Sequence, residues 1–257
     1  MKKEIINAFD IKSSEYPEIY DDDYSTNNLI HQEKRVRSRI VERRAIRYLY
    51  PLKNRGVVLD VGCGTGDLLL NIKNNCQEAM MHGVDISPKM IAIARQKAEE
   101  CGYKNIYFIE GDLKKITFHS NIVISIGVID YQEHPQNFLI ELSRLVCKDG
   151  YLMFSTSNGD SLLRRVRVFL SKVHTVLFNK TKRGGLKARP IKEAHLHNLL
   201  LQHGYTREKR FFITFGIGLF NSQMECYLDR VLAKYLSNNI FGKYLSLSVI
   251  YVYKKSY

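Results

Sequence analysis

The sequence predicts an α/β fold whose core is a mostly parallel β-sheet. Between about residues 56 and 158, apolar stretches of strand length alternate with stretches of helical periodicity. Acids or glycines close the first three apolar stretches. Short apolar strands separated by helices are typical of a parallel sheet covered by helices on both faces. With 257 residues and 45% apolar content, the chain can bury one substantial core, which favours a single domain.

The elements before Asn158 follow one another in a regular order. Residues 34–50 place apolar side chains about one helical turn apart among charges, which predicts an N-terminal helix. The stretches predicted as strands are 56–62, 80–86, 105–112, 121–128 and 151–158. The helices predicted between them are 67–75, 87–100 and 134–150. Ser87 can cap the second of these helices, Pro88 suits its first turn, and Gly150 is expected to end the third.

The pattern changes after Asn158. Residues 161–178 carry apolar side chains at helical spacing with basic side chains on the opposite side, and residues 179–190 form a basic loop. The elements predicted after this loop are a helix at 190–205, a strand at 207–215, a helix at 221–236 and a strand at 244–255. Two strands so close together near the end of the chain can pair antiparallel.

Several classes of protein are disfavoured by composition. No apolar run reaches the roughly 18 to 20 residues that span a bilayer, and the N-terminal residues contain no apolar stretch of signal-peptide length, so we expect a cytoplasmic protein. His195 and His197 are two apart on a predicted helix and do not share a face, so no metal site is expected. No C-x-x-C pair occurs among the five cysteines, Cys63, Cys76, Cys101, Cys147 and Cys226.

The net charge of +13 is concentrated in two segments. Residues 161–210 hold 13 Lys and Arg against two acids, and residues 34–55 hold nine against one. Such segments can be a solvated basic surface. They can also attract an anionic partner: a phosphorylated or carboxylated substrate, a membrane face, or RNA.

The most informative stretch is VLDVGCGTGDLLLNI, residues 58–72. An apolar strand ends in an acid, and three glycines follow at alternate positions before a helical pattern begins. The spacing D-x-G-x-G-x-G is neither a P-loop nor the dinucleotide fingerprint G-x-G-x-x-G. Glycines at this place let backbone amides approach a ligand, and ligands of open α/β sheets bind at the carboxyl ends of the strands.

This stretch resembles the first motif of the class I S-adenosylmethionine-dependent methyltransferases. The resemblance continues through HGVDIS, EGDL and the block from ISIGV to STSN, residues 124–158. It implies a loop around the methionine moiety after the first strand, an acid that pairs with the ribose hydroxyls, and an acid near the adenine amino group. The residues that it assigns to the cofactor are Asp60, Gly62, Cys63, Gly64, Gly66, Asp85, Ile86, Asp112, Leu113 and Ile126, with Tyr16 or Tyr20 closing over it.

The resemblance also implies an architecture. The family has a Rossmann-like sheet of seven strands, mostly parallel with an antiparallel pair at its C-terminal end. A single methyltransferase domain over 1–257 is therefore expected. Its expected parts are an N-terminal helical cap at 1–50, a cofactor-binding core at 51–158, a basic insertion or lid at 159–190, and the C-terminal part of the sheet at 191–257.

Methyl transfer from a sulfonium is an in-line displacement, and it needs a base only if the nucleophile starts protonated. The candidates just after the fourth strand are Asp130, Tyr131 and His134, and His31 is a second choice. Histidine is the side chain that ordinarily exchanges protons near neutral pH. His134 can equally be a helix-start residue before Pro135 with no catalytic role.

Three functions stay open for the acceptor side. The first is methylation of a small molecule, on an oxygen of an anionic or membrane-associated metabolite. The layout after residue 158 is similar to that of magnesium-protoporphyrin and quinone-biosynthesis methyltransferases. The second is RNA methylation, with the basic segments contacting phosphates, and the third is a catalytically silent fold that binds the cofactor or a partner. The basic helix at 161–178 suits either a membrane surface or a lid that packs its apolar face on the domain.

Overall fold

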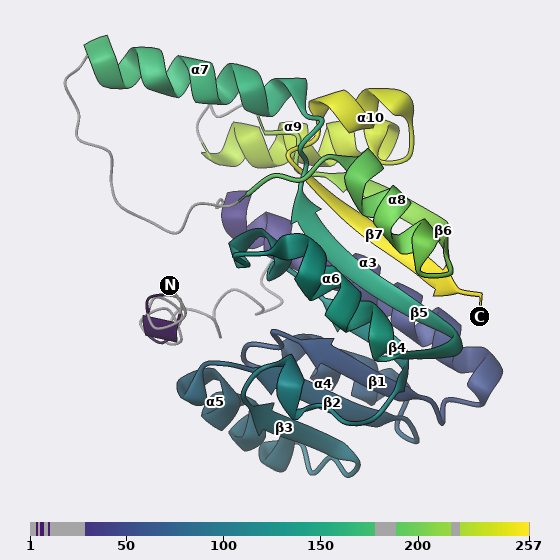
Figure 1. Cartoon of the computed structure of the whole chain (residues 1–257). Coiled ribbons are helices and arrows are strands. Elements are labelled where there is room, and N and C mark those ends of the chain that lie inside the picture. Colours follow the sequence, from purple (N-terminus) through teal and green to yellow (C-terminus); the bar gives the residue numbers. More distant parts are fainter. Residues whose placement is uncertain are drawn as a thin grey trace.

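A computed structural model describes residues 4, 6, 7, 10, 29–177, 189–216 and 222–256. Seven strands in this part of the chain form one sheet: β1 (Val57–Val61), β2 (Met80–Asp85), β3 (Ile106–Glu110), β4 (Ser120–Ser125), β5 (Val146–Ser157), β6 (Tyr205–Ile213) and β7 (Ser248–Lys255). Their order across the sheet is β3-β2-β1-β4-β5-β7-β6, as Figure 1 shows. Strands β1 to β5 run parallel, whereas β7 pairs antiparallel with both β5 and β6. The predicted seven-stranded sheet and its antiparallel C-terminal pair are confirmed.

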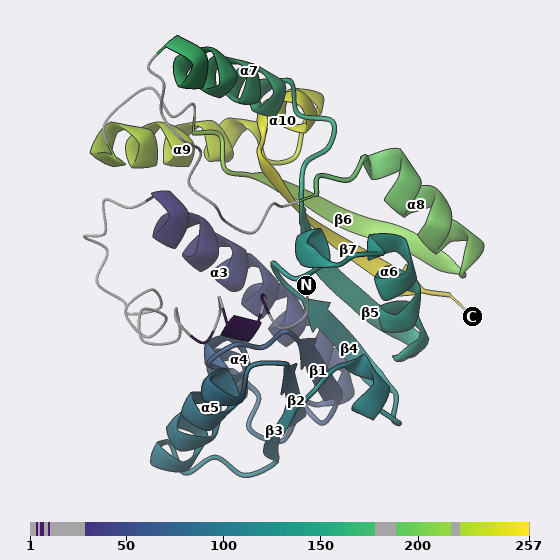
Figure 2. The ribbon, with the colours of Figure 1, turned by 60° about the vertical axis from the view of Figure 1, so that its left-hand side comes forward.

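Helices cover both faces of this sheet, and α7 (Leu162–Leu177) projects beyond the ends of its strands, next to α10 (Ile240–Leu245), as Figure 2 shows. Further α-helices of the described ranges are α3 (Leu29–Leu49), α4 (Asp67–Asn75), α5 (Pro88–Glu100), α6 (Pro135–Arg144), α8 (Glu193–Gln202) and α9 (Ser222–Leu236). Buried residues of α3, α4 and α5 share one hydrophobic cluster with the sheet, and those of α6 and α8 share the other. The two clusters lie on opposite faces because successive side chains of a strand point to opposite sides.

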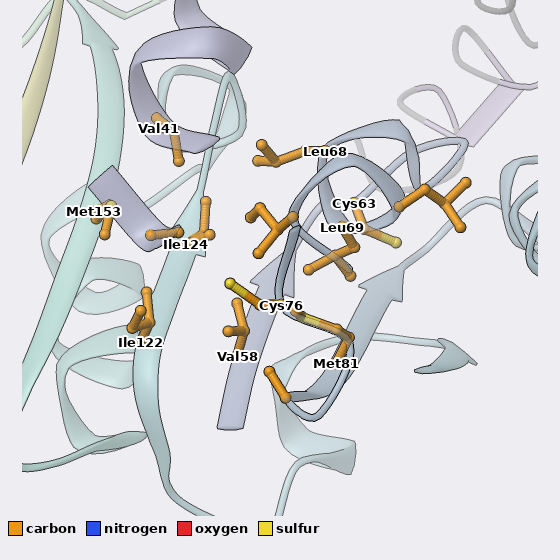
Figure 3. Close-up of a cluster of buried hydrophobic side chains, with 14 of the residues drawn as sticks. Val41, Val58, Cys63, Leu68, Leu69, Cys76, Met81, Ile122, Ile124 and Met153 are labelled. Carbon is orange, nitrogen blue, oxygen red and sulfur yellow. The ribbon is translucent and has the colours of Figure 1, made fainter. Parts of the chain in front are cut away.

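The cluster under α3 and α4 is centred on β1 and β4, where Val58, Ile122 and Ile124 are fully buried (Figure 3). Val41 of α3 and Leu69 of α4 contribute to the same cluster. This packing fixes α4 against the sheet, so the glycine loop between β1 and α4 is held at both of its ends.

Helix α3 is part of the fold's core and not only a cap over it. Val41, Ala45 and Leu49 are fully buried, and the ring of Tyr48 stacks on Tyr151 of β5 with 3.7 Å between ring centroids. The predicted N-terminal helix is therefore confirmed over Leu29–Leu49, and its buried side lies against the sheet.

Three element boundaries differ from the sequence-based expectation by several residues. The helix predicted at 134–150 ends at Arg144, and β5 starts at Val146. The register between β4 and β5 shifts after Val146, where Asp149 adopts φ 61° and a Cβ on Gly150 would stand 2.7 Å from the Asn121 carbonyl oxygen. Gly150 thus permits close approach of two strands instead of ending a helix. The short helix α10, Ile240–Leu245, was not predicted, and because it includes residues 244 and 245, the strand predicted at 244–255 starts only at Ser248.

Helix α7 is formed as predicted. A lid would bury its apolar side against the domain, but in the described part of α7 the apolar side chains are exposed and basic side chains contact the domain. Leu162, Val166 and Phe169 are 49%, 52% and 64% exposed, whereas the Arg164 and Arg167 guanidinium groups donate to the Leu247 and Gly216 carbonyl oxygens. These two hydrogen bonds attach the helix to the domain, and they give the two backbone carbonyl oxygens a donor. Within the described ranges, no helix is both long and apolar enough to cross a membrane.

Candidate active site

The loop between β1 and α4 depends on glycine at three positions. Gly62, Gly64 and Gly66 have φ values of 80°, 54° and 78°, in the left-handed region that side-chain-bearing residues rarely adopt. Space is also limiting, because a Cβ on Gly62 would lie 2.2 Å from Cγ2 of Val128, and one on Gly66 would lie 2.7 Å from the Phe108 ring. The loop is therefore a tight backbone cradle packed against the segment that follows β4.

Asp60 lies in β1 directly below this cradle. It is 3% exposed, and within the described part of the chain its Oδ1 atom has no hydrogen-bond partner. Burial, together with the charge of Asp85, raises the pKa of Asp60 from 3.8 to about 8. A buried carboxyl oxygen without a donor is costly, and such groups are found at sites that receive a ligand.

Asp85 ends β2 and is joined to the cradle. Its Oδ2 accepts a hydrogen bond from the Gly64 amide at 2.9 Å, and its Oδ1 accepts one from the Ser87 amide at 2.9 Å. Burial raises the pKa of Asp85, and the hydrogen bonds from these amides oppose that rise. Each oxygen keeps a further lone pair, so the carboxylate can still accept from two hydroxyls.

Asp10 was not among the sequence-based candidates. The Ser87 hydroxyl donates a hydrogen bond to the Asp10 carboxylate, which brings a residue of the leading segment to the end of β2. The charge of Asp10 also contributes to the raised pKa of Asp85. The sequence analysis drew Tyr16 and Tyr20 from this leading segment, but nothing in the sequence singled out Asp10. The candidate tyrosines Tyr16 and Tyr20 lie outside the described residues.

The end of β3 lies beside the end of β2, because the Gly111 amide donates to the Asp85 carbonyl oxygen at 2.8 Å. Asp112 follows, and its carboxylate accepts from the Lys114 amide at 3.2 Å at the start of a short 3-10 helix, Leu113–Lys115. Leu113 is buried. Ile86 and Ile126 are half-buried at the ends of β2 and β4. The predicted cofactor residues between 60 and 126 therefore come together at the carboxyl ends of the parallel strands. Cys63 is buried among them, and burial raises the pKa of its thiol.

The three candidates for the acceptor side differ in their surroundings. The Asp130 carboxylate is buried and accepts from the Thr156 hydroxyl at 2.6 Å and from the Ser157 amide at 3.0 and 2.8 Å. Tyr131 is half-buried, and burial and the charge of Asp130 raise its pKa. His134 is exposed at the start of α6, where its side chain makes no capping hydrogen bond. His31, the second-choice base, is half-buried on α3.

The donor set suits a cofactor that has a vicinal diol and positive charge. Asp85 offers two carboxylate oxygens, Asp60 offers a buried acid next to the glycine cradle, and the amides at the start of α4 can face a carboxylate. Lysine or arginine at the cradle would be expected for a phosphate, and residues 60–67 contain none. Within the described residues, no group of three or more His, Cys, Asp and Glu is placed to hold a metal.

The strand order, the glycine cradle and the acids at the strand ends define a cofactor-binding α/β protein of the class I methyltransferase type. Residues 52–200 match the family described as "Methyltransferase domain". The chain belongs to this family.

Curated relatives share parts of the chain. A malonyl-[acyl-carrier protein] O-methyltransferase of Halalkalibacterium halodurans is 26% identical over 110 residues, 40% of each chain. A demethylmenaquinone methyltransferase of Thermus thermophilus is 34% identical over 100 residues, 37% of this chain and 44% of the relative. The matched regions thus span less than half of these relatives.

A solved structure resembles the whole chain. The magnesium protoporphyrin IX methyltransferase from Synechocystis PCC 6803, crystallised with bound SAH, covers 99% of both chains with a TM-score of 0.67 and 20% identity. This similarity shows the same fold, and the class I architecture predicted from the sequence is confirmed.

Proposed function

We propose that this protein transfers a methyl group from S-adenosylmethionine to an oxygen of a small, anionic acceptor. The observation that carries the proposal is the cradle of positive-φ glycines with the unpartnered carboxyl oxygen of Asp60 below it and the Asp85 carboxylate bound to it. Malonyl-acyl-carrier-protein, quinone and porphyrin methyltransferases among the similar proteins support a small-molecule or carrier-bound acceptor.

Each residue of the cradle has a definite part in this proposal. Asp85 accepts hydrogen bonds from the ribose hydroxyls, and Asp112 and Leu113 border the adenine. Asp60 and the glycine amides hold the methionine end, where the positive charge of the cofactor would favour the ionised form of Asp60 and be stabilised by it. When bound, the cofactor supplies an electrophilic methyl group on a sulfonium. The protein supplies alignment and exclusion of water, which account for much of the catalysis in such displacements.

The acceptor meets this group from the side of the segment after β4, where Val128 borders the cradle. The Asp130 carboxylate accepts hydrogen bonds from Thr156 and Ser157 and so holds that segment against β5. Because its oxygens are engaged in this way, Asp130 suits a positioning role better than the role of a general base. If the acceptor is a hydroxyl, His134 and Tyr131 would be its proton acceptors, whereas an acceptor that is already ionised needs none.

A thermal-shift experiment with S-adenosylhomocysteine tests the donor assignment. We expect the product to raise the melting temperature of the wild-type protein, because a ligand that binds only the native state stabilises it. Asp85→Asn should remove most of the shift, whereas Glu99→Gln, an exposed acid on α5, should leave it intact. No shift with the wild-type protein would contradict the proposal.

We further propose that the outer side of α7 contacts a membrane surface peripherally. Leu162, Val166 and Phe169 face outward beside the exposed Arg165, an arrangement typical of helices that lie on anionic lipid. Sedimentation with phosphatidylserine vesicles should therefore fall for Phe169→Glu. Arg164 and Arg167 are unsuitable for this test because both donate to backbone carbonyls of the domain. Equal sedimentation of the wild-type protein and Phe169→Glu would overturn the proposal.

A further inference from the structure

Two arginine side chains lie near Glu33: Nη1 of Arg37 is 3.7 Å from its Oε1, and the charges of Asp130 and Glu33 both act on Arg164. Arg37 belongs to α3 and Arg164 to α7. In each of them the Nε atom is buried and has no hydrogen-bond partner within the described part of the chain. A buried donor without an acceptor costs about 1 to 3 kcal/mol, so two such donors in one region point to a missing acceptor group.

The nearby carboxylates are already engaged by other donors. Asp130 accepts from Thr156 and Ser157, as described above. Glu33 accepts from the Ser248 hydroxyl at 2.7 Å, and its contact with Arg37 is longer, 3.7 Å from Oε1 to Nη1. Asp229 accepts from the Phe215 amide at 2.5 Å and from the Gln32 amide group at 3.1 Å. Asp130 and Glu33 attract Arg164, and Glu33 also pairs with Arg37, but both Nε–H groups still lack an acceptor among the described residues.

Arg37 lies next to the cofactor cradle. A Cβ built on Gly127 would stand 3.6 Å from Nη1 of Arg37, and Val128, the next residue, is the one that borders Gly62. The Ser125 hydroxyl donates to the Val61 carbonyl oxygen at 3.0 Å, which ties the end of β4 to the end of β1. Gly127 has φ 72° and no side chain, so the Arg37 guanidinium lies directly against the backbone of this turn.

The described groups near Arg37 and Gly127 favour a nucleophile that arrives already ionised. The Asp130 carboxylate holds three hydrogen bonds, burial disfavours ionisation of Tyr131, and His134 is exposed at the start of α6. Carboxylates are ionised at neutral pH and match the planar, two-pronged donor set of a guanidinium.

We propose that Arg37 and Arg164 bind a carboxylate of the acceptor and that this carboxylate receives the methyl group. One carboxylate oxygen bonds to the methyl carbon while the sulfur–carbon bond breaks and its electron pair stays on sulfur. The products are a methyl ester and a neutral thioether, and no proton is transferred. This inference rests on the proposed function, and it adds the functional group of the acceptor and the residues that recognise it.

The test follows label from tritiated-methyl S-adenosylmethionine into an extract of cells that lack this gene, with the full-length protein added. Methyl esters release volatile methanol in mild alkali, whereas methyl ethers and methylamines do not. We expect the transferred label to become volatile. Label that survives alkali would overturn the inference and leave the proposed function standing. Wild-type protein that transfers no label would overturn both.

Variants test the arginines in the same assay. Arg37→Gln should lower the rate of transfer by about 30-fold or more, because it removes one partner of a buried charged contact. Arg43→Gln makes the same charge change at an exposed position of α3 and should stay within about twofold of wild type. Arg37→Gln must keep the wild-type thermal shift with S-adenosylhomocysteine, which shows that it is folded and binds at the donor site. Equal rates for the two variants would overturn the role of Arg37.

Discussion

Replacement of Asp60 by asparagine should stabilise the ligand-free protein at neutral pH and weaken its binding of the cofactor. Asp60 is 3% exposed, and burial together with the charge of Asp85 raises its pKa from 3.8 to about 8. An acid whose pKa is raised in the native state opposes folding as it ionises. The contribution of the neutral Asp60 carboxyl to the stability of the native state is therefore fully present below pH 3.8, and it is lost as the pH rises through about 8.

The size of the effect follows from this shift. At pH 7, about three units above the unfolded-state value, the opposing free energy is about 4 kcal/mol. A buried amide that lacks a full set of partners costs about 1 to 3 kcal/mol. Asp60→Asn should therefore gain about 1 to 3 kcal/mol at pH 7. For a chain of this length, each kcal/mol moves the melting temperature by about 2 to 4 °C.

Urea unfolding of the ligand-free wild-type protein and of Asp60→Asn, at about pH 5 and about pH 8, measures the difference. The advantage of the variant should grow with pH, and its thermal shift with S-adenosylhomocysteine should be smaller than that of the wild-type protein. A variant that is less stable by the same amount at both pH values would refute the reasoning. In that case the Asp60 carboxylate would accept hydrogen bonds within the protein and serve the structure and not the cofactor.

Three further predictions concern the frame around the site. Gly62→Ala should lower the free energy of unfolding in urea by about 2 to 5 kcal/mol, because strain at positive φ and overlap with Val128 add. Gly102→Ala is the control: Gly102 has φ 64° but open space around it, so this change should cost only about 1 to 2 kcal/mol. Asp130→Ala should cost about 3 kcal/mol, since it leaves the buried Thr156 and Ser157 donors unpaired, and a loss below about 1 kcal/mol would contradict the positioning role. Glu193→Gln should cost about 3 kcal/mol at pH 7. Burial opposes ionisation of Glu193, but Arg210, Arg207 and Lys243 outweigh it and lower its pKa, so its contribution is present above pH 4.5 and lost on acidification. Chemical unfolding from neutral pH to below pH 4 should show the two proteins converging.

Local patterns predicted the parallel strands and the glycine loop of this protein well. The apolar runs around Val58 and Ile124 are buried strands because their composition allows little else, and the glycines of D-x-G-x-G-x-G adopt the positive φ values that favour glycine. Ser87 caps α5 by accepting from the Met90 amide at 3.2 Å, as its position predicted. These features depend on residues close together in the sequence.

The acceptor half depends on contacts between distant residues, which local patterns do not contain. Amphipathic spacing predicted α7 but not which of its sides faces the domain, and the hydrogen bond from Arg164 to Leu247 decides that. Arginine is normally solvated, so nothing near Arg37 in the sequence indicated that its guanidinium lies beside Gly127. The boundary after Arg144 was missed because residues 145–150 suit a helix end as well as a strand start, and pairing with β4 decides between them.

Equilibrium dialysis of labelled S-adenosylmethionine with the wild-type protein and with Asp85→Asn tests the central claim most directly. The structure predicts one saturable site in the wild-type protein and a loss of affinity of about 30-fold or more in the variant, because two hydroxyls lose a charged acceptor. Absence of saturable binding to the wild-type protein, or equal affinity in the two proteins, would contradict it.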